Sequence, residues 1–209
     1  MKRSLEEILN AITHYTGAIF SLIGLILIIT HSVKIGKIGY TFGCVIFGLA
    51  LIFLYMMSGT YHILVNEKLK KLFRKLDHIG IYILISASYT PYIFTILDGK
   101  TRWIVFFIQW GCTLLGIVYK IFFTGKLKLL STIIYLIMGW MVVFVFKDVK
   151  ASLSVSSFNY LVTGGIVYTV GTIFYMMKNL KYSHVIWHIF VIFGSLFNYL
   201  SIYYIAETV

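Results

Sequence analysis

Three of the six histidines are spaced so that they could bind one metal ion. His184 and His188, in the segment SHVIWH, are four residues apart, which places both imidazoles on one face of a helix. His62, in the segment SGTYH, stands at the end of a separate apolar segment. Three imidazoles with an open fourth position are the arrangement of catalytic zinc, where a water molecule in that position becomes the nucleophile. The spacing predicts a zinc site at His62, His184 and His188, provided that the fold brings the two segments together.

Two further residues are candidates for the chemistry of such a site. Asp77 begins the next apolar segment, and a carboxylate there could orient the water molecule or accept its proton. Ser58 lies one helical turn before His62 on the same face and could hydrogen-bond to the same water molecule. We therefore predict catalytic roles for Asp77 and Ser58. His14 lies one turn into the first apolar segment and His78 follows Asp77 directly, and the sequence assigns them no role.

The same histidines also have a simpler interpretation. An HxxxH pair on a helix often only packs, and histidines are ordinary residues at a membrane surface, so the pair alone is a weak motif. A third histidine and an aspartate at the same depth favour the metal site, because an ionisable side chain near the membrane interior is costly unless it is used.

Seven stretches of the sequence lack Asp, Glu, Lys and Arg, and each is close to the length needed to cross a membrane. A hydrocarbon core of about 30 Å requires about 20 helical residues at about 1.5 Å each. Transmembrane β-strands would alternate over about 10 residues, and such alternation is not seen. We therefore predict an all-α integral membrane protein, a seven-transmembrane helical bundle. Its single domain covers 1–209, with approximate spans 10–33, 39–63, 77–97, 102–122, 129–147, 155–177 and 183–206.

The basic residues predict the orientation of this bundle. Of the 18 Lys and Arg residues, twelve fall in the termini and connectors on one side and six on the other. Positive charge stays with the cytoplasm, which predicts a cytoplasmic N-terminus and an outside C-terminus. His62, Asp77, His184 and His188 then lie at the same, cytoplasmic, level. The largest connector, about 66–76, contains KLKKLFRKL and is expected to form a short basic amphipathic helix on the inner leaflet.

Composition excludes several classes of protein. The chain is 60% hydrophobic and 12% charged, whereas soluble domains carry about 25% charged residues. The net charge of +11 would suggest nucleic acid as a partner of a soluble protein, but these basic residues lie between apolar runs. We therefore expect no nucleic-acid partner and almost no separate soluble domain. The two cysteines provide neither a disulfide framework nor CxxC metal spacing.

Three blocks of residues carry a resemblance to a known family. They are EILNAITH, then SGTYH with LDH, and finally HVIWH, which occur in this order across the seven predicted spans. With these blocks the sequence resembles the hemolysin III family, the bacterial branch of the progestin and adipoQ receptor family. The resemblance implies a multi-pass protein of the bacterial plasma membrane with a cytoplasmic N-terminus.

The resemblance also implies roles for the site residues. A zinc ion would be held by His62, His184 and His188, with Asp77, and also Ser58, in contact with the zinc water. Receptor members of the family look like lipid amide hydrolases acting on ceramide-like substrates, which makes a membrane lipid the expected partner. The long N-terminal region of the receptor members is missing here, so ligand sensing is not implied.

Two functions are compatible with these residues. The first is a zinc-dependent hydrolase of a lipid amide or ester, with Asp77 as general base and then acid. The second is a membrane-perturbing or pore-forming protein with a structural zinc. A structural zinc usually has four protein ligands, whereas only three are identified, which favours the hydrolase. A bis-histidine haem site is a weaker third possibility. The sequence identifies neither the substrate nor the oligomeric state.

Overall fold

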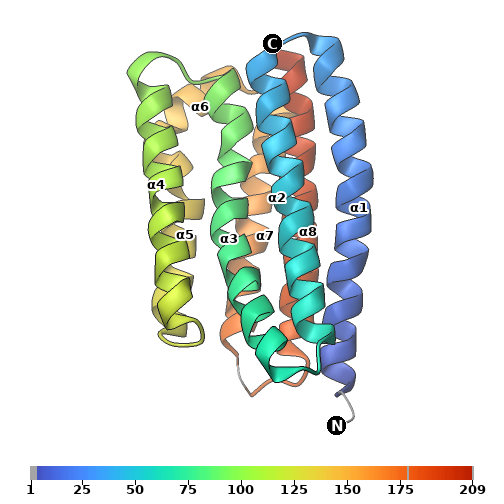
Figure 1. Ribbon diagram of the computed structural model, residues 1–209. Helices are drawn as coiled ribbons and strands as arrows, with labels where there is room; N and C mark the ends of the chain where they lie inside the picture. The colour runs from blue at the N-terminus through green and yellow to red at the C-terminus, as the bar shows by residue number, and fades with distance from the viewer. Residues whose placement is uncertain (1–3, 178, 209) are drawn as a thin grey trace.

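Every regular element in the described part of the chain is a helix (Figure 1). The computed structural model describes residues 4–177 and 179–208, so Lys2, Arg3 and Lys178 of the charge count lie outside the described residues. The elements in chain order are α1 (Leu5–Ile35), α2 (Ile38–Ile63), α3 (Glu67–Thr95), α4 (Gly99–Phe123), α5 (Lys128–Gly139), the 3₁₀ helix η1 (Met141–Val145), α6 (Phe146–Ser152), α7 (Val155–Met176), α8 (Ser183–Tyr204) and the 3₁₀ helix η2 (Ile205–Thr208).

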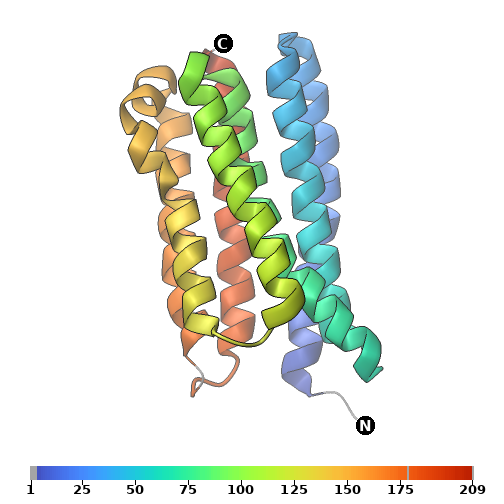
Figure 2. The same cartoon turned by 60° about the vertical axis from the view of Figure 1, so that its left-hand side comes forward.

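The long helices run side by side along one axis (Figures 1 and 2). Helix α2 packs between α1 and α3, α4 packs on α3, and α8 packs on both α1 and α7. Helices α1, α3 and α8 begin at the same end of the bundle, and α2 ends there (Figure 1). This end therefore gathers four segments that are far apart in the sequence, and we call it the convergent end.

The outer surface of the bundle is apolar. Large side chains such as Phe20, Phe107 and Leu115 are more than 60% exposed. Soluble proteins rarely expose so many large apolar side chains together. Within the described residues, five segments are long and apolar enough to cross a membrane, namely Leu5–Ile35, Ile38–Ile63, Gly99–Phe123, Lys128–Ser152 and Ser183–Glu207. The chain is therefore a multi-pass membrane protein. Helices α3 and α7 pack lengthwise in the same bundle but are not among these five.

The basic segment before the third predicted span is not a separate helix. It forms the first turns of α3, which continues from Glu67 to Thr95 without a break. The side chain of Asn66 accepts a hydrogen bond from the Leu69 amide at 3.1 Å and caps the helix at its beginning. The helical propensity of KLKKLFRKL joins this segment to the apolar part of α3, since no glycine or proline interrupts the two.

The fifth predicted span, 129–147, is not one continuous α-helix, and Tyr89 of α3 explains why. Its hydroxyl donates to the Gly139 carbonyl at 2.6 Å and accepts from the Val142 amide at 2.9 Å. The carbonyl of Gly139 is thereby taken out of the helical ladder, and the Val143 amide bonds instead to the Trp140 carbonyl at 3.1 Å. A side chain inserted into the ladder is a common cause of a helix break.

Two glycines let α2 approach α3 closely. A Cβ atom at Gly43 would lie 2.4 Å from the Pro91 Cα atom, and one at Gly39 would lie 2.7 Å from the Phe94 carbonyl oxygen. Any larger residue would therefore push the two backbones apart. This small-xxx-small pair thus allows close helix packing, and the contact fixes α2 against the helix that carries Asp77.

Candidate metal centre

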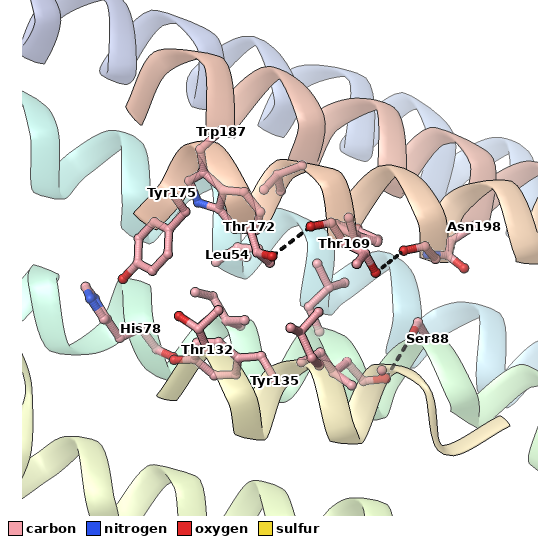
Figure 3. A pocket seen from close by; sticks show the side chains of 18 of the residues that line it. Leu54, His78, Ser88, Thr132, Tyr135, Thr169, Thr172, Tyr175, Trp187 and Asn198 are labelled. Carbon is pink, nitrogen blue, oxygen red and sulfur yellow. Dashed lines mark hydrogen bonds between the residues drawn. The ribbon is translucent and has the colours of Figure 1, made fainter. Parts of the chain in front are cut away.

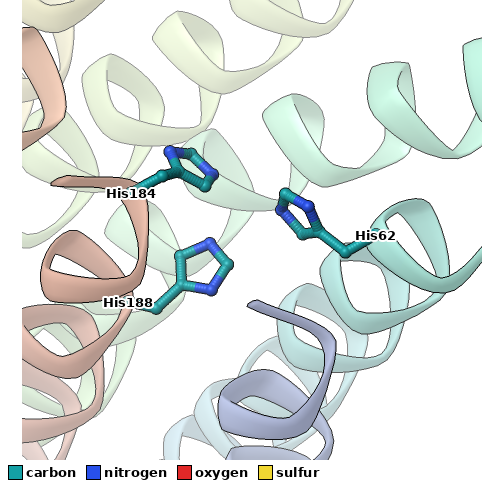
Figure 4. A group of neighbouring side chains, drawn as sticks. All are labelled: His62, His184 and His188. Carbon is teal, nitrogen blue, oxygen red and sulfur yellow. The ribbon is translucent and has the colours of Figure 1, made fainter. Parts of the chain in front are cut away.

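The structure brings the three predicted histidines together at the convergent end. His62 lies in the last turn of α2, and His184 and His188 lie in the first two turns of α8 (Figure 4). One nitrogen of each ring lies within 4.8 Å of the others. The ring centroid of His62 is 5.1 Å from that of His184 and 5.1 Å from that of His188. Three ligand atoms from two helices therefore face a common point, as a metal site requires.

The orientation of His62 is fixed by a carboxylate of α1. Its Nδ1 atom lies 3.0 Å from Oε2 of Glu7. Because an ionised carboxylate only accepts, Nδ1 carries the hydrogen and Nε2 is left with its lone pair. That Nε2 atom is buried and has no hydrogen-bond partner among the described residues. A carboxylate behind a histidine whose other nitrogen is free is the usual support of a metal ligand.

His188 is held in the same tautomer by the backbone of α1. Its Nδ1 atom lies 3.3 Å from the Asn10 carbonyl oxygen and 3.2 Å from the Thr13 hydroxyl. A carbonyl oxygen cannot donate, and the Thr13 hydroxyl itself donates to the Asn10 carbonyl at 2.9 Å. The hydrogen therefore sits on Nδ1, and Nε2 is left as the possible ligand atom. Helix α1 thus supports a histidine on α2 and another on α8.

His14 forms a second layer behind this group. Its ring stacks on His188 with centroids 3.5 Å apart, and Tyr55 meets it edge-on at 5.1 Å. His14 is 3% exposed, and both of its ring nitrogens are buried without a hydrogen-bond partner among the described residues. The Asn10 side-chain oxygen shares this condition. Buried polar atoms of this kind are normally satisfied by ordered water or an ion.

Asp77 and Ser58 are buried near the histidines but are not part of the ligand group. The Asp77 carboxylate lies 3.2 Å from Nδ1 of its neighbour His78, and Asp77 lines the same cavity as His62. Ser58 is fully buried one turn before His62, and its hydroxyl has no partner within the described chain. Their positions are compatible with the predicted roles, which stay predictions.

A cavity of about 650 Å³ extends from the histidines into the bundle. At one end it is lined by His62, His184 and Asp77, and further along by apolar residues such as Ile93, Val105 and Leu161. Figure 3 shows its side chains between His78 and Tyr175 at one end and Ser88 and Asn198 at the other. The volume is within the range of about 300–1,000 Å³ typical of small-molecule sites. A polar end and an apolar body suit an amphiphilic ligand.

The donor set fits a borderline-soft divalent metal such as zinc. It consists of three imidazoles, two of them with the supporting acceptors that fix a free Nε2 atom. No fourth His, Cys, Asp or Glu of the described residues joins the group, which leaves the fourth position to a small ligand. Sequence reasoning missed the supporting roles of Glu7, Asn10 and Thr13. Glu7, Asn10 and His14 recur at helical spacing on one face of α1, which is the signal that could have revealed them.

Comparison with known proteins finds relatives over most of the chain. The chain matches the family described as Haemolysin-III related over residues 2–199. It is 38% identical to Hemolysin-3 of Bacillus cereus over 204 residues, which cover 97% of this chain and 93% of that protein. It is 41% identical to the Hemolysin-3 homolog of Bacillus subtilis (strain 168) over 190 residues, or 91% and 89% of the two chains. A more distant relative is the human monocyte to macrophage differentiation factor, 27% identical over 168 residues, covering 76% of this chain and 68% of that protein.

Proposed function

The chain belongs to the Haemolysin-III related family, and from this premise and the site we propose that it is a zinc-dependent hydrolase of membrane lipids. The bond cleaved is an amide, as in ceramide-like lipids, or an ester. The observation that carries this proposal is the convergence of three imidazole ligand atoms at the polar end of a largely apolar cavity. The experiment that tests it measures bound zinc and the release of fatty acid by the same purified protein.

The proposed topology is seven spans in the cell membrane, with the N-terminus in the cytoplasm. Helix α1 begins at the convergent end and α8 ends at the opposite end, which supports an odd number of passes (Figure 1). The seven passes are α1, α2, α3, α4, α5 with η1 and α6, α7, and α8. Lys68, Lys70 and Lys71 in the first turns of α3 support a cytoplasmic convergent end, since positive charge stays on that side.

The three imidazoles would hold the metal, and α1 orients two of them. Glu7 directs Nε2 of His62 toward the common point, and Asn10 does the same for His188. When bound there, zinc would supply Lewis-acid polarisation of a carbonyl group and a water molecule acidic enough to lose a proton near neutral pH. Ser58 can accept or donate a hydrogen bond one turn deeper in the membrane than His62.

Asp77 handles the proton in this proposal. Asp77 lines the same cavity as His62 and is only 8% exposed, so a proton placed on its carboxylate is protected from bulk water. Asp77 accepts a proton at a carboxylate oxygen and returns it to the nitrogen or oxygen of the leaving group. His78, 3.2 Å away, keeps the carboxylate oriented between these two steps.

The apolar part of the cavity accommodates the acyl chain. Ile85, Ile93 and Leu161 come from α3 and α7, on two sides of the cavity, and no acidic or basic residue lies on this part of its lining. A lipid whose acyl chain enters this part of the cavity would place its carbonyl group at the histidine end. Such positioning is the main contribution that a rigid bundle can make to a hydrolytic reaction.

A second function is suggested by the names of the bacterial relatives. Hemolysin-3 of Bacillus cereus is named for lysis of cells, which a membrane-perturbing protein with a structural zinc would also explain. In that case the three histidines would stabilise the bundle and Asp77 would have no effect on any reaction. Turnover of a lipid that depends on Asp77 separates the two functions.

A further inference from the structure

The wall of the cavity formed by α4 and the turn after it carries an unusual lysine. Lys120 lies in the last turns of α4 and is only 1% exposed. Its Nζ atom donates to the Ser131 hydroxyl at 2.6 Å and lies 5.2 Å and 5.8 Å from the ring centroids of Tyr119 and Tyr135. An ammonium group taken out of water is costly unless it is paired. A hydroxyl and two aromatic rings do not neutralise it.

No carboxylate of the described residues forms an ion pair with Lys120. The ion pairs there are His62 and Lys70 with Glu7, His78 with Asp77, and Arg102 with Asp98, and none includes Lys120. Asp77 and Arg74 are both close enough to act on the charge of Lys120, but Asp77 already faces His78 at 3.2 Å. Asp77 therefore offsets the charge of Lys120 only in part, and Arg74 adds positive charge.

Arg74 and Lys126 extend the positive charge to the mouth of the cavity. Both are exposed and both line the cavity, as Lys120 does. Arg74 reaches from α3 to the turn between α4 and α5, where a Cβ atom at Gly125 would lie 3.0 Å from its guanidinium nitrogen. Gly125 has a φ of 83°, which a residue with a side chain rarely adopts. The turn is therefore shaped so that Arg74 can lie against it.

These residues form one surface beside the metal centre. We define the cationic wall as Arg74, Lys120 and Lys126. It lies toward the histidine end, because Lys120 is 5.8 Å from the ring of Tyr135, whose hydroxyl donates to the His78 carbonyl at 3.2 Å. Arg74 also lies one helical turn before Asp77 on α3. A ligand whose carbonyl group faces the histidines would have its headgroup against the cationic wall.

We propose that the cationic wall binds the phosphate group of a lipid, so that this protein selects a phosphate-bearing lipid over a neutral one. Arginine offers a planar pair of donors and lysine a point charge, and both are standard partners of phosphate. Lysines on the surface are enough to attract the protein to the anionic inner leaflet, so a buried ammonium group such as that of Lys120 indicates a specific ligand. The choice of substrate rests on the proposed function, whereas binding to the wall does not.

The test measures lipid binding to the purified full chain in neutral detergent. The probes are a short-chain phosphatidic acid, a diacylglycerol with the same chains, and inorganic phosphate. We expect the wild type to bind the phosphatidic acid at least about tenfold more tightly than the diacylglycerol. Lys120→Gln and Arg74→Gln should each weaken binding of the phosphatidic acid by about tenfold or more and so remove that preference, because a charge-assisted hydrogen bond is lost. The control is Lys147→Gln, an exposed lysine of α6 outside this cavity, which should change nothing.

Several results would overturn the proposal. Equal affinity for the two lipids would do so, and so would a preference that survives both Lys120→Gln and Arg74→Gln. If inorganic phosphate displaced the lipid at equal concentration, the cationic wall would be a site for a free anion and not for a lipid. If Lys120→Gln fails to fold, the lipid preference of Arg74→Gln, which changes an exposed residue at the mouth of the cavity, still tests the proposal. Binding without hydrolysis would refute the proposed function alone, and hydrolysis of neutral lipids without preferential binding would refute the cationic wall alone.

Discussion

Nδ1 of His62 on α2 lies 3.0 Å from Oε2 of Glu7 on α1, a residue 55 positions earlier in the chain. Lys70 on α3 bonds to the same carboxylate oxygen at 3.3 Å. Glu7 therefore links three helices at the point where the candidate metal ligands converge. It sets the tautomer of His62 and compensates part of the positive charge that a bound metal ion would bring.

Replacing Glu7 by Gln should weaken metal binding without unfolding the protein. An amide has the size of the carboxylate but lacks its charge, so His62 loses a charged acceptor. We expect zinc affinity to fall by about 10- to 100-fold, measured by competition with a chelator. Glu6→Gln is the matched control, since no ion pair of Glu6 is found among the described residues. Equal affinity in both variants would show that Glu7 does not support the site.

Replacing Tyr89 by Phe should destabilise the bundle at the break after α5. The hydroxyl bonds to the Gly139 carbonyl and to the Val142 amide, and both lose this partner. We expect a loss of about 1–3 kcal/mol, seen as a lower Tm in detergent. Tyr160→Phe is the control, because Tyr160 contacts its neighbours through ring stacking on Phe197 and Tyr204. An unchanged Tm in Tyr89→Phe would mean that the break is set by the local sequence.

The topology can be tested with a reporter fused after Val209. The excess of basic residues on one side predicts that the reporter lies outside the cell. A matched fusion before Met1 should read as cytoplasmic. A cytoplasmic signal from the C-terminal fusion would require an even number of spans or an inverted chain, and His62 and His188 would then not share the cytoplasmic level.

Replacing Asp77 by Asn separates catalysis from structure. The variant should keep its fold and most of its zinc, because Asp77 is not one of the three clustered ligands. It should lose general acid–base assistance, which is about 10²- to 10⁴-fold in the rate of fatty-acid release from lipid amides or esters. The assay compares both forms on a lipid that the wild type cleaves. Equal turnover by the two forms would reject the role assigned to Asp77.

Parts of this molecule could be predicted from the sequence because they follow from local periodicity. The spacing of His184 and His188 fixes a shared helix face, and the run of apolar segments places His62 at the same level. The contact between Glu7 and His62 could not be predicted this way, because it depends on the rotation of α1 against α2. The break after Gly139 likewise depends on a tertiary contact from Tyr89. Hydropathy alone separates the segment 66–76 from α3, because it is much lower there than in the apolar span. The helical propensity of this segment nevertheless continues the helix into that span.

The central claim is that His62, His184 and His188 bind one metal ion. The most direct test is the metal content of the purified protein and of its single His→Ala variants. We predict about one zinc ion per wild-type chain and a sharp loss in each of the three variants. His31→Ala is the control, because His31 stacks on Tyr203 outside the ligand group and should leave the zinc content unchanged. A zinc content that stays at the wild-type level in His184→Ala and His188→Ala would contradict the metal site.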